Sequence, residues 1–293
     1  DFDTIFGGLY IGKNPTPEHN SYLVIHLNFA EVDSGLDDYK EGLDTHCRLV
    51  FEDFCTRYAA LLPQGTKEEM KSEQGAIAQL RFLCQKCAEV KQKIYLFIDE
   101  YDNFTNMILS SEEHLERYKG QTHGEGYLRR FFNTIKGAAN TSLGRIFVTG
   151  VSPVTMDDLT SGFNIGTNYS LKPRFNEMTG FTEEEVRDML SYYAGVLPFN
   201  HTVDELIEIM KPWFDNYCFA INSYGKTTMY NSIMVLNFVD NYIENDCNIP
   251  DKMVEPNIRI DYSKIRMLIR HDKEFAHDAS IIQELVTKGY ATG

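Results

Sequence analysis

This chain of 293 residues lacks several features that would place it at once in a familiar class. It has no apolar run approaching the roughly 20 residues that a membrane-spanning helix needs, so we do not expect an integral membrane protein. No secretory signal sequence, repeat or low-complexity tract stands out. The hydrophobic fraction of 43% and the charged fraction of 24% are ordinary for a globular protein with a buried core.

Basic side chains are also scarce, with 28 Lys and Arg against 43 Asp and Glu, which gives a formal net charge of −15. Nucleic-acid binding depends mainly on neutralising phosphates, so this balance argues against a broad nucleic-acid surface. A local basic patch, such as Arg129 and Arg130 with Lys136, stays open.

The six cysteines do not follow the spacing of a disulfide framework, and the chain is much larger than a cysteine-stapled module. Reduced thiols fit better and favour a cytoplasmic location. Cys84 and Cys87 match C-x-x-C, but they continue a helical stripe with Ile77 and Leu80, which is typical of core positions. No second pair completes a zinc site.

The chain begins at Asp1 without a Met, in what resembles the middle of a folded segment. We therefore expect that further sequence lies upstream and that a targeting sequence could have been lost with it.

Strands and helices are predicted to alternate over the first half of the chain. Continuous apolar runs predict buried strands, and periodic apolar residues predict helices between them. This order is typical of an α/β fold, a parallel sheet flanked by helices, and the continuous hydrophobicity predicts burial on both faces of the sheet. The predicted strands are 21–28, 94–98 and 145–150, the helices are 36–62, 67–90 and one from Tyr127, and a glycine-containing loop is predicted at 110–126.

The second half is predicted to be mainly helical. Thr182 and Thr202 each stand three residues before a Glu, which is the pattern of a capping box that opens a helix. A third predicted helix carries Ile233, Leu236, Val239 and Ile243. We place the boundary near 173–179 and so expect an α/β core at 1–175 and a helical, lid-like domain at 176–293.

The stretch KIYLFIDEYDNF, Lys93 to Phe104, leads a buried strand into two adjacent carboxylates, Asp99 and Glu100. In ATPases built on a parallel sheet, such an Asp holds Mg²⁺ through water and the following Glu orients the attacking water. The alternative is that both residues only cap the next element or face solvent. Thr149, at the end of the next predicted strand, is a candidate sensor of the γ-phosphate.

A loop that holds phosphates is harder to find. Gly225, Lys226 and Thr227 match the end of the motif G-x-x-x-x-G-K-[ST], but Ala220 stands where the first Gly belongs. No buried strand leads into this stretch, so a surface turn is the better interpretation.

Taken together, these residues resemble the AAA-ATPase-like family, common in gut Bacteroidetes and Clostridia, whose members often carry a PD-(D/E)XK nuclease-like domain at the C-terminus. The similar segments are FGGLYIG (6–12), VIHLNF (24–29), FIDEYDN (97–103, the family's Walker B strand), FVTGVSP (147–153, its sensor strand), NEMTGFTEEEV (176–186), WFDNYCF (213–219) and MYNSIMVLNF (229–238).

The resemblance implies a P-loop NTPase-type sheet whose phosphate loop and first strand precede Asp1. It implies ATP and Mg²⁺ as cofactors, with Asp99 for the metal, Glu100 for the water and Thr149 as the sensor. Arg145 and Arg174 are candidate charge-stabilising residues, although a solvated surface role is open for each. Hydrolysis would serve a nuclease-like domain or a protein partner. The alternative is a non-catalytic interaction scaffold with a degenerate nucleotide site.

Overall fold

The computed structural model describes residues 2–32, 39–103, 126–139, 141–150 and 166–253. Among the described residues, those up to Gly150 belong to one compact unit and residues 166–253 belong to a second. The loop predicted at 110–126 lies outside the described residues except for Gly126, and so does the chain after Met253.

Within the described residues, the first unit is built on a sheet of three parallel strands in the order β1-β2-β3. In the register, Asn28 is paired with Asp99, and Ile98 is paired with Val148. The carboxyl ends of all three strands therefore lie at one edge of the sheet. The strands are β1 (Leu23–Asn28), β2 (Ile94–Asp99) and β3 (Leu143–Val148).

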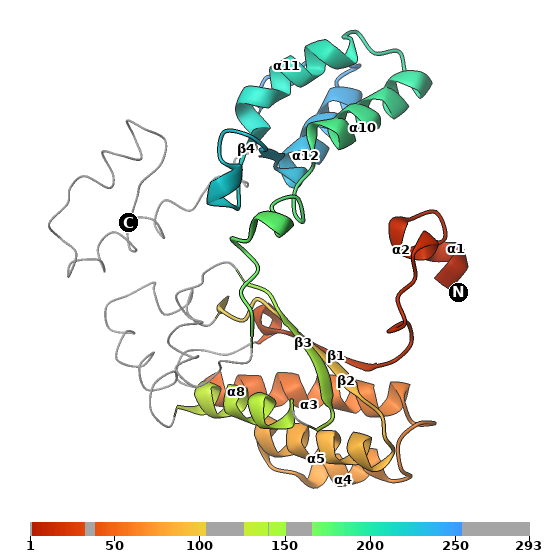
Figure 1. Ribbon diagram of the computed structural model, residues 1–293, viewed down its shortest axis with the longest axis vertical. Helices are drawn as coiled ribbons and strands as arrows, with labels where there is room; N and C mark the ends of the chain where they lie inside the picture. Colours follow the sequence, from red (N-terminus) through yellow and green to blue (C-terminus); the bar gives the residue numbers. More distant parts are fainter. Residues whose placement is uncertain (1, 33–38, 104–125, 140, 151–165, 254–293) are drawn as a thin grey trace, which may run out of the picture. The chain divides into compact units, whose positions relative to one another are not determined.

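Figure 1 shows the helices that connect these strands on one face of the sheet. Parallel crossovers are right-handed, and successive crossovers that advance in one direction place their helices on the same side. The predicted helix 67–90 is in fact two helices, because Glu73 and Gln74 are extended, with ψ of 137° and 109°, and Gly75, where the second helix begins, has a φ of +80°. The connecting helices are α3 (Tyr39–Arg57), α4 (Thr66–Ser72), α5 (Gly75–Glu89) and α8 (Tyr127–Ala138).

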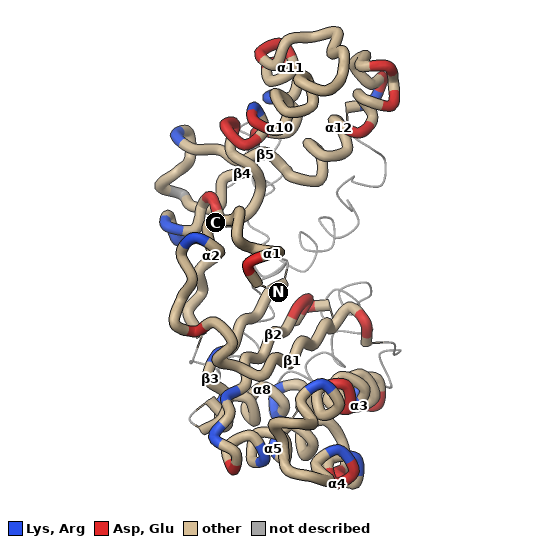
Figure 2. The backbone as a smooth tube through the Cα atoms, turned by 90° about the vertical axis from the view of Figure 1, so that its right-hand side faces the viewer, with Lys and Arg blue, Asp and Glu red and all other residues tan. Residues whose placement is uncertain are grey.

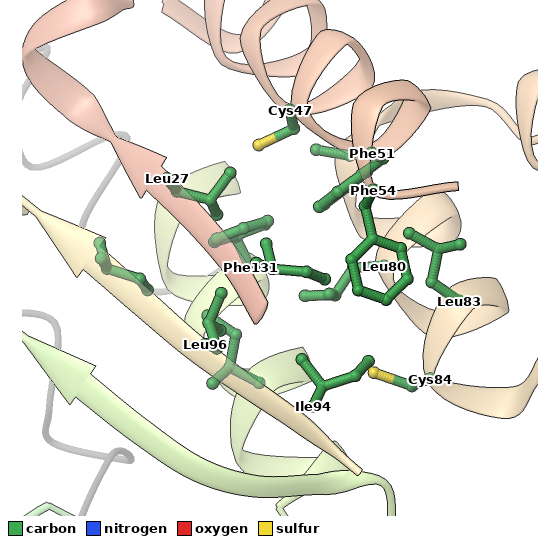
Figure 3. Packing of buried hydrophobic residues seen from close by; sticks show 14 of the residues in the cluster. Leu27, Cys47, Phe51, Phe54, Leu80, Leu83, Cys84, Ile94, Leu96 and Phe131 are labelled. Atoms are coloured by element: carbon green, nitrogen blue, oxygen red, sulfur yellow. The ribbon is translucent and has the colours of Figure 1, made fainter. Parts of the chain in front are cut away.

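The core of this unit lies between the sheet and the helices. Figure 3 shows Leu27 of β1 and Leu96 of β2 pointing toward side chains of α3, α5 and α8, such as Phe51 and Phe131. Cys84 and Cys87 are buried on α5, as their helical spacing predicts, and all six cysteines are unpaired.

The opposite face of the sheet is less buried than the sequence predicts. Alternate residues of β2 are only half-buried, and Phe147 of β3 is 41% exposed. Aromatic rings fill part of this face, with Tyr95 stacked on Phe97 at 4.2 Å between centroids. Large aromatic side chains give these strands continuous hydrophobicity without burying both faces.

The second unit is mainly helical and has its own core. Thr182 and Thr202 both form complete capping boxes, which confirms the two predicted helix starts. A short antiparallel pair, β4 (Asp215–Tyr217) and β5 (Met229–Tyr230), was not predicted from the sequence. The helices are α10 (Glu183–Val196), α11 (Val203–Phe214) and α12 (Ser232–Glu244).

The other helical elements of the described chain are short. They are the helices α1 (Phe2–Phe6) and α2 (Tyr10–Lys13), and the 3₁₀ turns Phe29–Glu31, Pro173–Phe175 and Ile221–Ser223. None of the helices in the described part of the chain has the length and apolar character required to span a membrane.

Candidate functional site

Asp99 and Thr149 meet at the carboxyl edge of the sheet. Asp99 is the last residue of β2, and Thr149 directly follows β3. The Thr149 hydroxyl donates a short hydrogen bond to Asp99 Oδ1, which also accepts a hydrogen bond from the amide of Glu100 at 3.1 Å. Two residues that lie fifty positions apart in the sequence are thus brought into direct contact.

Backbone hydrogen bonds hold these two residues in place. The amide of Thr149 donates to the carbonyl of Ile98 at 2.9 Å, and the amide of Tyr101 donates to the carbonyl of Thr149 at 3.1 Å. The parallel ladder therefore continues one step beyond the strands themselves. Because main-chain bonds fix both strand ends, the contact between Asp99 and Thr149 follows from the register of the sheet.

Glu100 occupies an unusual backbone conformation with a φ of +51°. A side chain other than glycine is disfavoured in this left-handed region by roughly 1–2 kcal/mol. Such residues persist where the surrounding structure holds them, and they are frequent at functional sites. Here the conformation turns the chain sharply away from β2 immediately after Asp99. The half-buried Glu100 therefore does not continue the pattern of β2, in which successive side chains point to opposite faces of the sheet.

The turn after β2 is anchored by residues that the sequence analysis did not single out. The amide of Asn103 donates to the carbonyl of Glu100 at 2.9 Å, and its side chain donates to the carbonyl of Phe29 at 3.1 Å. Asp102 is fully buried. A Cβ on Gly150 would lie 2.4 Å from Asp102 Oδ1. Polar residues that follow DE, and a Gly after a strand, are the sequence features that point to such a turn.

Asn28, the last residue of β1, is the polar residue that this strand contributes to the carboxyl edge of the sheet. Its Oδ1 accepts a hydrogen bond from the amide of Ala30 at 3.0 Å, and its amide donates to Glu31 Oε1 at 3.2 Å. These bonds cap the short 3₁₀ turn that follows β1. Figure 2 shows acidic residues where β2 ends, so the edge carries negative charge beside neutral polar groups.

The geometry of Asp99 fits a magnesium ion held through water. Its carboxylate is half-buried, and among the described residues Oδ2 has no hydrogen-bond partner. Carboxylate oxygens suit Mg²⁺, which is usually held by one or two carboxylates plus water and substrate phosphates. In the described ranges no group of three His, Cys, Asp or Glu side chains could hold a metal ion.

The other candidate residues are engaged elsewhere. Arg145 forms an exposed ion pair with Glu18, so its charge is already balanced. Arg174 lies in the second unit, with its guanidinium 5.6 Å from the centroid of the Phe175 ring. At the G-K-T sequence, Gly225 has a φ of +71°, and the amide of Lys226 donates to the carbonyl of Ser223 at 3.0 Å. This confirms that the stretch is a surface turn.

A parallel sheet flanked by helices, with an acidic residue at the end of one strand and a Thr at the end of its neighbour, is an α/β architecture consistent with the P-loop type. A family model described as "Predicted AAA-ATPase" matches residues 1–160. The chain therefore belongs to the AAA-ATPase-like family, as the resemblance implied. No curated protein and no solved structure gives a significant match to it.

Proposed function

We propose that the intact protein binds MgATP and hydrolyses it at the carboxyl edge of this sheet. The observation that carries the proposal is the hydrogen bond from Thr149 to Asp99, which joins the ends of two neighbouring strands. Ligands of open α/β sheets bind outside the carboxyl ends of the strands. Membership of the family supports nucleotide and magnesium use in general.

Each of the three residues has a separate role in this proposal. Asp99 would hold Mg²⁺ through water, Glu100 would orient the attacking water, and Thr149 would sense the γ-phosphate. When bound, the ion would neutralise charge on the phosphate oxygens. The phosphate ligands would be supplied by the segment that the resemblance places before Asp1.

Thr149 also orients Asp99. A hydrogen bond to an ionised acceptor is stronger than one between neutral groups, and it restricts the rotation of the carboxylate. With Oδ1 occupied by Thr149 and by the amide of Glu100, Oδ2 is the oxygen left for a water of the ion. Loss or binding of the γ-phosphate near Thr149 would then change how Asp99 is held.

We further propose that hydrolysis drives a conformational change that acts on a protein partner or on a nuclease-like domain of the intact protein. The motivation is the family resemblance together with the separate helical unit that follows the α/β unit. In this proposal the helical unit acts as a lid-like domain.

The test is a calorimetric titration with MgATPγS. It uses this chain and a version extended upstream through the expected phosphate loop. We expect binding by the extended protein that is lost in Asp99→Asn. The matched control is Asp53→Asn, because Asp53 is 63% exposed on α3 and lies away from the sheet edge. Absence of binding by the extended protein would overturn the proposal and favour an interaction scaffold.

Turnover distinguishes the role of Glu100 from that of Asp99. Glu100→Gln keeps the size of the side chain but removes the carboxylate that orients water. We expect it to bind MgATP normally and to hydrolyse it at least about 100-fold more slowly, as is typical when a positioned acid–base group is removed. Unchanged turnover would show that Glu100 does not have this role.

A further inference from the structure

A small polar pocket opens among the helices α3, α5 and α8. Its volume is about 330 Å³, at the lower end of the range for small-ligand sites. Three basic side chains line it, each from a different helix: Lys40, Arg81 and Arg130. Figure 2 shows basic positions on all three helices. Such a cluster stands out in a chain with a net charge of −15.

Asp44 is the one carboxylate among the described lining residues, and it is already engaged. Asp44 Oδ1 accepts a hydrogen bond from the amide of Ala76 at 2.7 Å, and it also accepts a short one from the Tyr127 hydroxyl. Its Oδ2 lies 3.1 Å from Lys40 Nζ. Asp44 therefore caps the start of α5 and ties α3 to α8, and its partners among the described residues are Ala76, Tyr127 and Lys40 rather than the two arginines.

The two arginines are held close to the pocket by neutral contacts. Arg81 donates to the Thr134 hydroxyl at 3.3 Å. The guanidinium of Arg130 lies 5.6 Å from the centroid of the Tyr127 ring, and Lys40 Nζ lies 5.2 Å from the same ring. These contacts orient the two arginines without neutralising them. Among the described residues that line the pocket, three cations face one carboxylate, which gives this lining two net positive charges.

We propose that this pocket binds a phosphate dianion. Two guanidinium groups match the planar, bidentate recognition of phosphate oxygens, and the dianion balances the net charge. The start of α5 at Gly75 adds the positive end of a helix dipole. The source of the group is either free phosphate or a small phosphate ester, since the volume suits a small molecule. The pocket shares no residue with the edge that carries Asp99.

The proposal is tested by calorimetric titration of the full chain with inorganic phosphate and, separately, with glycerol 3-phosphate, without added magnesium and against chloride at equal ionic strength. We expect saturable binding that weakens about tenfold or more in Arg130→Gln and in Arg81→Gln, because each loses charge-assisted hydrogen bonds. The matched control is Arg57→Gln, since Arg57 is 58% exposed on α3 and paired with Asp53. Circular dichroism verifies that each variant is folded.

A second variant should increase the affinity. Asp44→Asn keeps an oxygen that can accept from Ala76 and Tyr127 but removes the negative charge, so phosphate should bind more tightly than to the wild type. Asp99→Asn should leave phosphate binding unchanged, which separates this inference from the proposed ATPase site. The proposal would be overturned if all variants bound phosphate equally, if acetate bound as tightly as phosphate, or if phosphate gave no binding beyond the chloride control. Comparison of the two phosphate ligands identifies the source.

Discussion

Gly150 and Asp102 lie so close together that no larger side chain fits at position 150. A Cβ there would be 2.4 Å from Asp102 Oδ1 and equally close to the ring of Tyr101. Both neighbours are buried, at 0% and 5% exposure, so neither can move aside into solvent. The turn after β2 and the residue that follows Thr149 are therefore packed directly against each other.

We expect Gly150→Ala to destabilise the first unit by about 1–3 kcal/mol, the usual effect of overpacking a tight site. The measurement is urea-induced unfolding. Gly137→Ala is the matched control, because no atom lies within 4 Å of a Cβ at this position in α8. Equal stability of the two variants would contradict the close packing of Gly150.

Thr149→Val should lower stability and weaken the candidate site. It keeps the shape of the side chain but removes the hydroxyl that donates to Asp99. A hydrogen bond to a charged group contributes about 1.5–3 kcal/mol, less where water reaches the pair, so we expect a loss near 1 kcal/mol. Urea unfolding measures this loss, and titration of the extended protein should show weaker MgATPγS binding.

Thr149→Ser is the control for the hydroxyl, since it retains the donor. It should restore most of the affinity that Thr149→Val loses. If serine binds MgATPγS no better than valine, the methyl group rather than the hydroxyl is what matters at this position.

The stability of the first unit should fall on mild acidification because of His46. Burial lowers the pKa of His46 below its usual value; Glu31 opposes this shift and His26 reinforces it. The unfolded chain, with a His pKa of about 6.5, then takes up a proton that the folded chain does not. This group therefore makes stability fall progressively as pH drops below about 6.5, until the folded-state pKa is reached.

The variant His46→Gln removes this contribution. Unfolding free energies of both proteins, measured from pH about 7 to about 5, should converge or cross as the wild type loses more stability. Parallel curves would show that His46 titrates equally in the folded and unfolded states. His46 Nε2 is buried without a hydrogen-bond partner in the described part of the chain, which fits a neutral ring.

Removal of either capping box should destabilise the helical unit. Thr182 and Thr202 each accept a hydrogen bond at 3.2 Å from the amide three residues on. Thr182→Ala and Thr202→Ala should each lower stability by about 1 kcal/mol, while the serine variants stay close to the wild type. The measurement is hydrogen exchange of amides in the first turns of α10 and α11.

The control for these variants is Thr45→Ala, because Thr45 is exposed within α3. That change removes a β-branched residue from a helix and should be neutral or slightly stabilising. If the cap variants exchange no faster than the wild type in these turns, the caps do not limit local opening.

Much of the fold was predictable because local sequence determines local structure. Apolar runs located the three strands, and the Thr-x-x-Glu spacing located the starts of α10 and α11. The division of 67–90 into two helices was missed, since it shows only in the extended backbone of Glu73 and Gln74 and the positive φ of Gly75. Continuous hydrophobicity also overstated the burial of the sheet, because aromatic rings can remain half-exposed.

The sequence by itself determined which residue types stand at the ends of the strands: Asp99 and Glu100 after one apolar run, Thr149 after the next. Only the tertiary structure decided which of them touch, because parallel pairing and its register bring the ends of β2 and β3 to one edge. Packing also decided that Gly150 lies against Asp102 and that three basic residues from separate helices line one pocket. Contacts of this kind join residues far apart in the chain, and no local pattern encodes the distance between them.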